Sequence, residues 1–375
     1  MNEKDLANYL KELEAVTNIE SPTNYAAGIN EVIKFFADKA DSLKLQSKVV
    51  NLGAGDKAGD CLLVSNNLNA EKFDMLLMAH ADTVFPVGTI KEAPFRTEGN
   101  RAKALGVIDD KGCALMAFYA MQYLTDADFS FVLLINSCEE TGSPYSGDFI
   151  KEYAKKSKYC IVLEGAREDG SLVATRKGIL KYKIDFNGVS AHAGNNPERG
   201  ASAVAEAANF IVEFSKLNDY TEGHTFNTIM LKGGDAVNVI PEFASVSLEV
   251  RYVKDSSIAF TENKIKEVLG KPLNAKVSHT VVKEDQKFPM FDEKNLPFMK
   301  SVVEEAGKTV GVDVKWVNAG GGSDGNLASS VGCPTVDGMG PIGGNMHNKE
   351  EYLEIDSVIP RCNLLIESIK KFAKR

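Results

Sequence analysis

Three short runs of apolar residues stand out in the first half of the chain. They are Met75 to Ala79, Phe131 to Ile135 and Cys160 to Leu163, and none has the polar alternation of a half-exposed strand. Runs of this length suit central strands of a sheet that helices cover on both faces. A helical stretch from Gly112 to Leu124 separates the first two runs. The pattern predicts an α/β layer built on a largely parallel sheet.

Helical spacing precedes the first apolar run. Apolar residues recur at this spacing from Leu6 to Val16, and again from Ile29 to Phe36 after a Ser21-Pro22 start signal. The opening stretch therefore predicts an amphipathic helix and differs from the basic-then-apolar layout of a signal peptide. No segment approaches the roughly 18 uninterrupted apolar residues that a membrane helix needs. We therefore expect no membrane partner.

The pattern changes near Lys177 and changes back after about Gln286. Between these points lie, in order, an alternating strand in KGILKYKIDFNG, a helix over 201–217, strands over 226–231 and 244–251, a helix over 257–269 and a strand over 275–282. This β-α-β-β-α-β order is typical of a ferredoxin-like fold. We therefore expect residues 1–176 and 287–375 to form one α/β domain. Residues 177–286 would be an inserted second domain.

Length, charge and cysteine content narrow the class of protein. A chain of 375 residues exceeds what one hydrophobic core usually holds, which agrees with two domains. The net charge of −9 comes without a basic cluster, so we expect no nucleic acid partner. The six cysteines lack paired spacing, which favours reduced thiols over a disulfide framework. Together these features predict a cytoplasmic protein that acts on small molecules.

Each of the three apolar runs leads into residues that can bind metal. His80 and Asp82 follow the first run, Glu139 and Glu140 follow the second, and Glu164 follows the third. In open α/β sheets, ligand sites form just beyond the carboxyl ends of the strands. An unpaired cluster of acids there would repel itself, and a bound dication removes that repulsion. The coincidence of three strand ends favours a metal site.

Two loops add further candidates. Asp109 lies in GVIDDKG, which opens a helix, and His347 lies in the Gly-rich GPIGGNMHNKEEY. Nitrogen and oxygen ligands of this mix suit zinc, and also cobalt or manganese. Taken singly, each residue has an ordinary interpretation as a structural histidine, a carboxylate at a helix start or a solvated acid. Only the whole set points to metal chemistry.

Six motifs, in this order and spacing, resemble those of the co-catalytic dizinc metallopeptidases. They are MAHADTV, GVIDDKG, EETGS, LEGA, SAHAG and GNMHNKEEY, and the resemblance extends from about His80 to the last helix. The family includes aminoacylase, acetylornithine deacetylase, succinyl-diaminopimelate desuccinylase, tripeptidase and the folate-cleaving glutamate carboxypeptidase. The glutamate carboxypeptidase branch resembles this chain most in sequence, through VNVIP, VRY, GGGSD and the ending EYLEIDSVIPR.

The resemblance implies that residues 1–176 and 287–375 form a catalytic dizinc hydrolase domain and that residues 177–286 form a lid or dimerisation domain. It also implies a complete set of ligands for two zinc ions. Asp109 would bridge the two ions. His80 and Glu164 would complete the protein ligands of one ion, and Glu140 and His347 those of the other. Cobalt or manganese could substitute for zinc.

The resemblance also implies roles for residues that do not bind metal. Glu139 would be the general base that takes a proton from the metal-bridging water. Asp82 would hydrogen-bond His80 and fix its tautomer. His192, in SAHAG, would reach from the second domain of a partner subunit and stabilise the oxyanion, so a homodimer would complete the site. An ordinary loop histidine is the alternative interpretation of His192.

Substrate-binding residues follow from the same resemblance. Arg251 would grip a substrate carboxylate through its guanidinium fork, with Asn238 as its neighbour in that pocket. Gly321, with Gly320, Gly322 and Ser323, would line the substrate cleft. Alternatively, Arg251 is a solvated strand arginine and the glycines form a plain tight turn.

Three positions qualify the resemblance. Glutamate at Glu164, where aminopeptidase branches tend to have aspartate, favours substrates with a free carboxylate and an acylated nitrogen. Cys138 stands where the family commonly has an acid, and Cys113 replaces a common glycine. An inert buried thiol and an altered hydrogen-bond environment for the metal are both open interpretations of Cys138.

The leading hypothesis is a dizinc carboxypeptidase that releases a C-terminal amino acid, with glutamate as the first candidate, from a peptide or N-acyl group. The alternative is a deacylase of N-acetyl- or N-succinyl-amino acids with the same dizinc site. A third hypothesis, a catalytically silent relative that only binds small molecules or a partner, is disfavoured by the presence of Glu139. A P-loop enzyme is excluded because AGGGSDG lacks the Gly-Lys-Ser/Thr ending.

Overall fold

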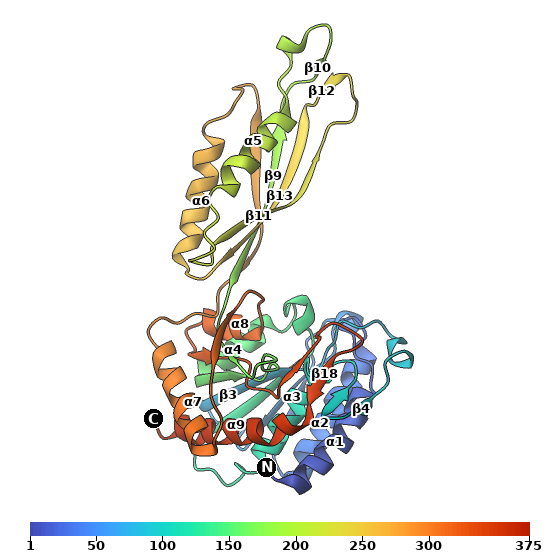
Figure 1. The fold of residues 1–375 in the computed structure, drawn as a ribbon, viewed down its shortest axis with the longest axis vertical. Coiled ribbons are helices and arrows are strands. Elements are labelled where there is room, and N and C mark those ends of the chain that lie inside the picture. The colour runs from blue at the N-terminus through green and yellow to red at the C-terminus, as the bar shows by residue number, and fades with distance from the viewer. The chain divides into compact units, whose positions relative to one another are not determined.

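The computed structural model describes residues 1–375, and the chain divides into two compact units (Figure 1). Unit 1 comprises Met1–Thr175 and Met290–Arg375, and unit 2 comprises Arg176–Pro289. Unit 2 is thus inserted between two segments of unit 1. No helix in either unit is long and apolar enough to cross a membrane.

A six-stranded sheet, in the order β1-β2-β6-β3-β7-β16, forms the centre of unit 1. Its strands are β1 (Gln46–Val50), β2 (Cys61–Ser65), β3 (Phe73–His80), β6 (Phe131–Asn136), β7 (Ser157–Val162) and β16 (Thr335–Val336). Strands β6, β3, β7 and β16 are parallel, whereas β1 and β2 pair antiparallel at one edge. The three apolar runs are β3, β6 and β7, so the prediction of a largely parallel sheet is confirmed.

Alternate residues of the central strands enter two different cores. Met75 and Leu77 of β3 pack into one core, and Leu76 and Met78 pack into the other. The first core is covered by α1 (Glu3–Thr17), α2 (Ala26–Ser42), α3 (Lys111–Met121), α7 (Leu296–Val310) and α9 (Val358–Ala373). The second is covered by α4 (Gly147–Lys156) and α8 (Asp324–Ser330). Coverage of both faces explains why these strands lack polar alternation.

Helix α2 begins at Ala26, later than the expected start at Ser21 and Pro22. The Ser21 hydroxyl donates to the carbonyl of Ala81 (2.7 Å), and Pro22 forms a β-bridge with Thr83. These residues therefore pair with the loop after β3 instead of opening a helix. Their pairing holds that loop in place beside the end of β3.

Two smaller sheets complete unit 1. The four-stranded antiparallel sheet β17-β18-β5-β4 is built from β4 (Arg96–Glu98), β5 (Arg101–Lys103), β17 (Gly343–Gly344) and β18 (Tyr352–Glu354). The two-stranded sheet joins β8 (Leu172–Arg176) to β15 (Trp316–Ala319). Because β18 pairs with β5, the loop after β5 and the loop before β18 are neighbours.

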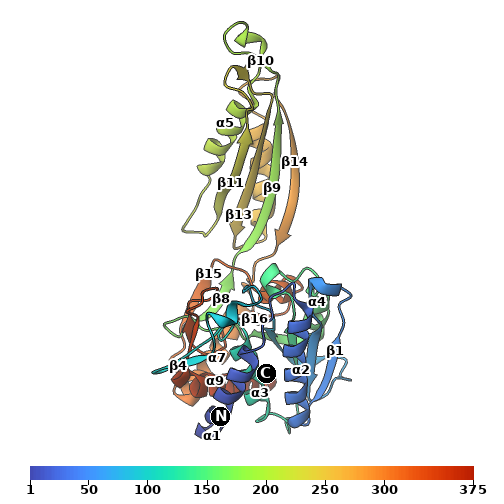
Figure 2. The same ribbon diagram turned by 90° about the vertical axis from the view of Figure 1, so that its right-hand side faces the viewer.

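Unit 2 has an antiparallel sheet in the order β11-β13-β9-β14, with both helices on one face (Figure 2). Its elements are β9 (Gly178–Asn187), α5 (Ala203–Ser215), β11 (Thr225–Gly233), β13 (Phe243–Tyr252), α6 (Ser256–Leu269) and β14 (Ser278–Lys287). A short ladder joins β10 (Ala191–His192) to β12 (Val239–Ile240). This element order confirms the predicted ferredoxin-like fold.

Candidate active site

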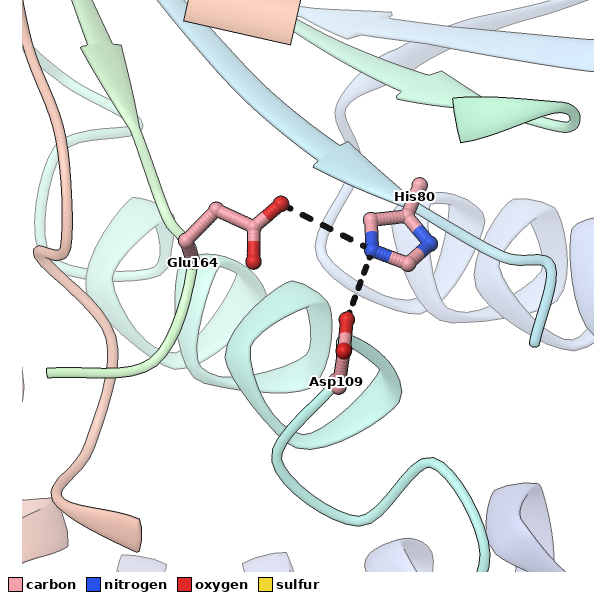
Figure 3. Close-up of side chains that lie close together, drawn as sticks. All are labelled: His80, Asp109 and Glu164. Atoms are coloured by element: carbon pink, nitrogen blue, oxygen red, sulfur yellow. Dashed lines mark hydrogen bonds and ion pairs between the residues drawn. The ribbon is translucent and has the colours of Figure 1, made fainter. Parts of the chain in front are cut away.

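The carboxyl ends of the parallel strands β3, β6 and β7 meet at one edge of the unit 1 sheet. His80 is the last residue of β3, Glu164 follows β7, and Asp109 precedes helix α3. Figure 3 shows the three side chains pointing toward one another. The Nε2 atom of His80 lies 3.0 Å from Oδ1 of Asp109 and 3.7 Å from Oε1 of Glu164. The strand ends thus lie close together, as expected, although their residues are far apart in the sequence.

A second group lies on the other side of Asp109. The Nε2 atom of His347 is 3.2 Å from Oδ2 of Asp109 and 3.2 Å from Oε2 of Glu140. Within each group of three residues, the candidate ligand atoms lie within 4.8 Å of one another. Asp109 therefore directs one oxygen to each group, which is the arrangement expected of a carboxylate shared by two metal sites.

The charges at this edge fit divalent cations. Burial, and next the charge of Asp109, raise the pKa of Glu140 to about 7 and that of Glu164 well above its ordinary value. Burial acts to raise the pKa of Asp109 as well, but hydrogen bonds from His347 and His80 hold it well below its usual range. Buried carboxylates are costly unless a positive charge compensates them. Two histidines and three carboxylates are also a donor set that zinc and its neighbours prefer.

Asp82 holds both His80 and the turn that carries Glu139 and Glu140. Its backbone carbonyl and its Oδ1 atom lie 3.0 and 3.3 Å from Nδ1 of His80, so Nε2 is the nitrogen that faces the centre. Its two carboxylate oxygens also accept hydrogen bonds from the backbone N–H groups of Glu139 (3.1 Å) and Glu140 (3.2 Å), and from the Thr23 hydroxyl (2.7 Å). Asp82 thereby orients the histidine and the turn that carries both glutamates.

Glu139 and Glu140 occupy a short 3₁₀ turn, Glu139–Thr141, directly after β6. The Glu140 carboxylate faces His347, as described above. Burial raises the pKa of Glu139 well above its ordinary value, and the charges of Asp324 and Asp82 act in the same direction. Glu139 is thus a carboxylate with increased proton affinity beside the two groups.

Two buried acids near the centre were not found from the sequence. Asp324 accepts hydrogen bonds from the Asn136 amide (2.7 Å) and the Ser143 hydroxyl, which ties helix α8 to the end of β6. Glu351 accepts hydrogen bonds from the backbone of the loop that carries Asp109. Both acids lie inside quoted motifs, GGGSD and GNMHNKEEY, but nothing in the spacing marked them out.

Comparisons with known proteins identify the family. Residues 174–277 match the M20 peptidase dimerisation domain. Carboxypeptidase G2 of Pseudomonas sp. (strain RS-16) is 30% identical over 365 residues, which cover 94% of this chain and 86% of that protein. The chain belongs to the M20 metallopeptidase family. As an M20 member it is a hydrolytic enzyme, and the family implies bound metal ions.

Two further proteins are similar over most of their length. Succinyl-diaminopimelate desuccinylase of Nitrosospira multiformis is 28% identical over 319 residues, or 77% of this chain and 82% of that protein. The crystal structure of aminopeptidase PepT from Bacillus cereus superposes with a TM-score of 0.80 at 21% identity, covering 100% of this chain and 99% of that one. The structural likeness confirms the fold predicted from the sequence.

The candidate substrate-binding residues of unit 2 do not form one pocket within the chain. Arg251 lies at the end of β13 where that strand pairs with the start of β9, and Nε donates to Glu249 (2.8 Å). Asn238 lies beyond the opposite end, where its carbonyl accepts from Ala193 (2.9 Å). Along β13, the nine residues from Phe243 to Arg251 are separated by eight steps of about 3.4 Å, or roughly 27 Å. The expectation that Asn238 neighbours Arg251 is therefore wrong within one subunit, because the strand direction separates them.

His192 instead is the neighbour of Asn238. His192 pairs with Val239 in the short ladder between β10 and β12, and Val239 is the residue that follows Asn238 in the chain. The Nδ1 atom of His192 accepts hydrogen bonds from the backbone N–H groups of Gly194 (3.0 Å) and Asn195 (3.2 Å). With Nδ1 accepting, the neutral ring carries its proton on Nε2, and this exposed side chain has one N–H to donate.

The Gly-rich loop of unit 1 is exposed at its first three residues, Gly320, Gly321 and Gly322. A Cβ atom at Gly320 or Gly321 would meet nothing within 4 Å, so space remains in front of these positions. Ser323 then caps helix α8 and donates to Asp337 (2.6 Å). The loop thus has a fixed base and an open glycine segment.

Both unusual cysteines are buried and hydrogen-bonded. The Sγ atom of Cys138 lies 3.2 Å from the Ser146 hydroxyl, and that of Cys113 donates to the carbonyl of Ile108 (3.1 Å). Burial raises the pKa of both thiols above the ordinary value. These thiols therefore lack the thiolate character that nucleophilic or metal-binding cysteines need.

Proposed function

We propose that this M20 enzyme hydrolyses the amide bond that joins a C-terminal amino acid to a peptide or an N-acyl group. Glutamate is the leading candidate for the released residue. The observation that carries the proposal is the pair of candidate ligand groups that share Asp109, with Glu139 beside them. The 30% identity to carboxypeptidase G2 supports release of a C-terminal residue, as does the glutamate at position 164.

In this proposal the two groups hold two zinc ions. His80, Asp109 and Glu164 would hold one ion, and Asp109, Glu140 and His347 the other. Two such cations supply Lewis acidity to the scissile carbonyl and lower the pKa of the attacking water. The carbonyl oxygen and Oδ1 of Asp82 keep Nε2 of His80 directed at the centre throughout.

Glu139 manages the proton. A carboxylate oxygen of Glu139 accepts the proton of the attacking water and then donates it to the leaving nitrogen, acting first as general base and then as general acid. Its raised pKa suits both halves of this task, because a carboxyl with very low proton affinity would not accept the proton. The hydrogen bonds from the Glu139 and Glu140 amides to Asp82 direct one glutamate to the metal and leave the other for the proton.

Recognition of the substrate carboxylate is assigned to Arg251 and requires a homodimer. The match to a dimerisation domain over 174–277 supports self-association. The outer strand β11 also exposes consecutive apolar side chains, Ile229 (61%), Met230 (45%) and Leu231 (46%), at an unpaired sheet edge. His192 and Asn238 of the partner subunit would then complete the pocket, with Nε2–H of His192 donating to the developing oxyanion.

The second candidate function is deacylation of N-acetyl- or N-succinyl-amino acids. The 28% identity to succinyl-diaminopimelate desuccinylase favours it. Both reactions break an amide next to a free carboxylate and use the same groups in unit 1. They differ only in which side of the bond the enzyme must recognise.

The test combines metal analysis with a substrate panel. Metal content of the zinc-reconstituted chain is measured first, and the metal-free chain serves as the control for every substrate. The panel holds α- and γ-linked C-terminal glutamates, benzoylated amino acids, and N-acetyl- and N-succinyl-amino acids. Two ions per chain with release of C-terminal glutamate is the expected result. Turnover of acetyl or succinyl substrates alone would replace it with the deacylase function, and a chain that takes up no metal would refute both.

A further inference from the structure

Glu351 is a fully buried carboxylate that binds the backbone of the Asp109 loop. Its side chain accepts three hydrogen bonds, from the N–H groups of Gly106 (3.0 Å), Ile108 (2.9 Å) and Asp109 (3.0 Å). The three donors lie within four residues of one another, in the segment that presents Asp109 to both ligand groups. Burial, and next the charge of Asp109, raise the pKa of Glu351 to about 8, while these three hydrogen bonds act in the opposite direction.

Glu351 itself belongs to the loop that carries His347. That loop connects β17 to β18, and Glu351 is its last residue before β18. Backbone hydrogen bonds within the loop join Asn348 to Asn345 (3.0 Å) and Glu351 to Asn348 (2.9 Å). His347 therefore sits in a closed turn whose end is tied to the Asp109 loop. One carboxylate connects two candidate ligands that lie far apart in sequence.

The two ligand groups depend on this connection to different degrees. In the first group, His80 and Glu164 come from the ends of β3 and β7, which the sheet holds side by side. The second group instead needs His347, whose loop must keep its register against the Asp109 loop. The Asp109 loop is also held to β3, because the His80 backbone N–H donates to Asp110 (3.0 Å). A loosened connection should therefore separate Nε2 of His347 from Oδ2 of Asp109 more than it disturbs the first group.

We propose that Glu351 is a positioning residue for the second metal group, Asp109–Glu140–His347. Its carboxylate fixes the Asp109 loop against the His347 loop and so sets the spacing of two ligands of one ion. The inference rests on the proposed two-metal function, and it adds a residue that does not touch the metal but decides how well one of the two ions is held.

Glu350 provides a matched control in the same loop. It has the same side chain and charge, but it lies on the surface and pairs with Arg96 (2.8 Å) and Lys103 (3.0 Å). Exposed ion pairs of this kind contribute little to stability. Glu350→Gln therefore removes one negative charge next to the same turn without touching the Asp109 loop.

The experiment titrates the metal-free chain with zinc in competition with a chromophoric chelator. Wild type, Glu351→Gln, Glu350→Gln and His347→Ala are compared, and the step that His347→Ala removes is assigned to the second group. The amide of Glu351→Gln keeps the shape of the side chain but turns an accepting oxygen into a donor that faces backbone N–H groups. We expect Glu351→Gln to weaken the second step roughly ten- to hundredfold, as loss of a supporting contact does. The first step should weaken much less, and Glu350→Gln should match wild type in both.

Several outcomes would overturn the proposal. Wild-type affinity for both ions in Glu351→Gln would do so, and so would equal weakening of both steps together with a lower unfolding temperature, which would indicate a general role in the fold. If Glu351→Gln does not fold, amide hydrogen exchange of wild type decides. Protected amides at Gly106, Ile108 and Asp109 are expected. Exchange as fast as that of exposed loops would refute the role of Glu351 in holding the Asp109 loop. A wild type that binds no zinc would refute the proposed function instead. The exchange measurement would still test whether Glu351 holds the Asp109 loop.

Discussion

The candidate metal ligands and the candidate substrate-binding residues differ in how far one chain assembles them. All five candidate ligands lie in unit 1, where their donor atoms converge and buried carboxylates hold the supporting backbone. In unit 2, Arg251 lies at one end of the sheet, whereas His192 and Asn238 lie beyond the other. A single chain therefore brings the candidate metal ligands together, but it does not bring Arg251 together with His192 and Asn238.

The difference separates chemistry from recognition. If unit 1 carries the chemistry, substitutions there should alter turnover or metal binding whatever the substrate. If unit 2 carries recognition, substitutions there should depend on the substrate and on the partner subunit. Each prediction below tests one side of this division.

The largest effect is expected from the adjacent glutamates. Glu139→Gln should lower kcat by roughly 10²–10⁴-fold, the usual contribution of a general base, while metal content stays at the wild-type level. Glu140→Gln, its neighbour, should lose metal as well as turnover because it removes a candidate ligand. Metal analysis and kcat of both variants provide the check. Nearly wild-type kcat in Glu139→Gln would refute its role in proton transfer.

The next effect is expected from the histidine of unit 2. His192→Ala should lower kcat by roughly 10²–10³-fold, as loss of one oxyanion donor does, without changing metal content. If the partner subunit supplies His192, mixing this variant with Arg251→Ala should restore one working site in each mixed dimer. The measurement is activity before and after subunit exchange. Absence of recovery in verified mixed dimers would count against a shared site and would place His192 outside the pocket.

A smaller effect is expected at Arg251. Arg251→Ala should raise KM for carboxylate-bearing substrates roughly ten- to hundredfold, since hydrogen bonds to charged groups contribute about 1.5–3 kcal/mol. The KM of Arg251→Lys should lie between those of wild type and Arg251→Ala, because lysine keeps the charge but lacks the planar fork. Metal content should not change in either variant. An unchanged KM in Arg251→Ala would remove Arg251 from binding of the substrate carboxylate.

The sequence predicted which strand-end side chains lie together because parallel strands obey a simple rule. Their carboxyl ends meet at one edge, so His80 and Glu164 could be placed together without knowing any distance. Asn238 and Arg251 had no such rule. Their separation of thirteen residues says nothing until the direction of β13 is known, and that direction puts them at opposite ends of a sheet. The assembly of the substrate pocket could not be predicted for this reason.

The supporting acids escaped prediction for a different reason. Asp324 binds side chains at the end of β6, and Glu351 binds backbone N–H groups more than two hundred residues away. A carboxylate that accepts from distant backbone leaves no periodicity or spacing, and Glu350 beside it has the same side chain on the surface. The burial of Glu351 and its hydrogen bonds in the folded chain reveal which glutamate turns inward.

The last prediction concerns pH and sharpens the division between the units. A hydrogen bond to Asp109 raises the pKa of His347 to about 9, and burial raises the pKa of Glu140 to about 7 in the metal-free chain. Metal binds the deprotonated forms, so zinc must displace one proton between about pH 7 and 9 and a second below about pH 7. Affinity of the second group should therefore rise about tenfold per pH unit up to about pH 9, and more steeply below about pH 7. Arg251 lies outside these groups, so its contribution to KM should not follow the same pH dependence. Zinc titrations and KM values across the same pH series test this contrast, and a zinc affinity that does not vary with pH would contradict the protonation of His347 and Glu140.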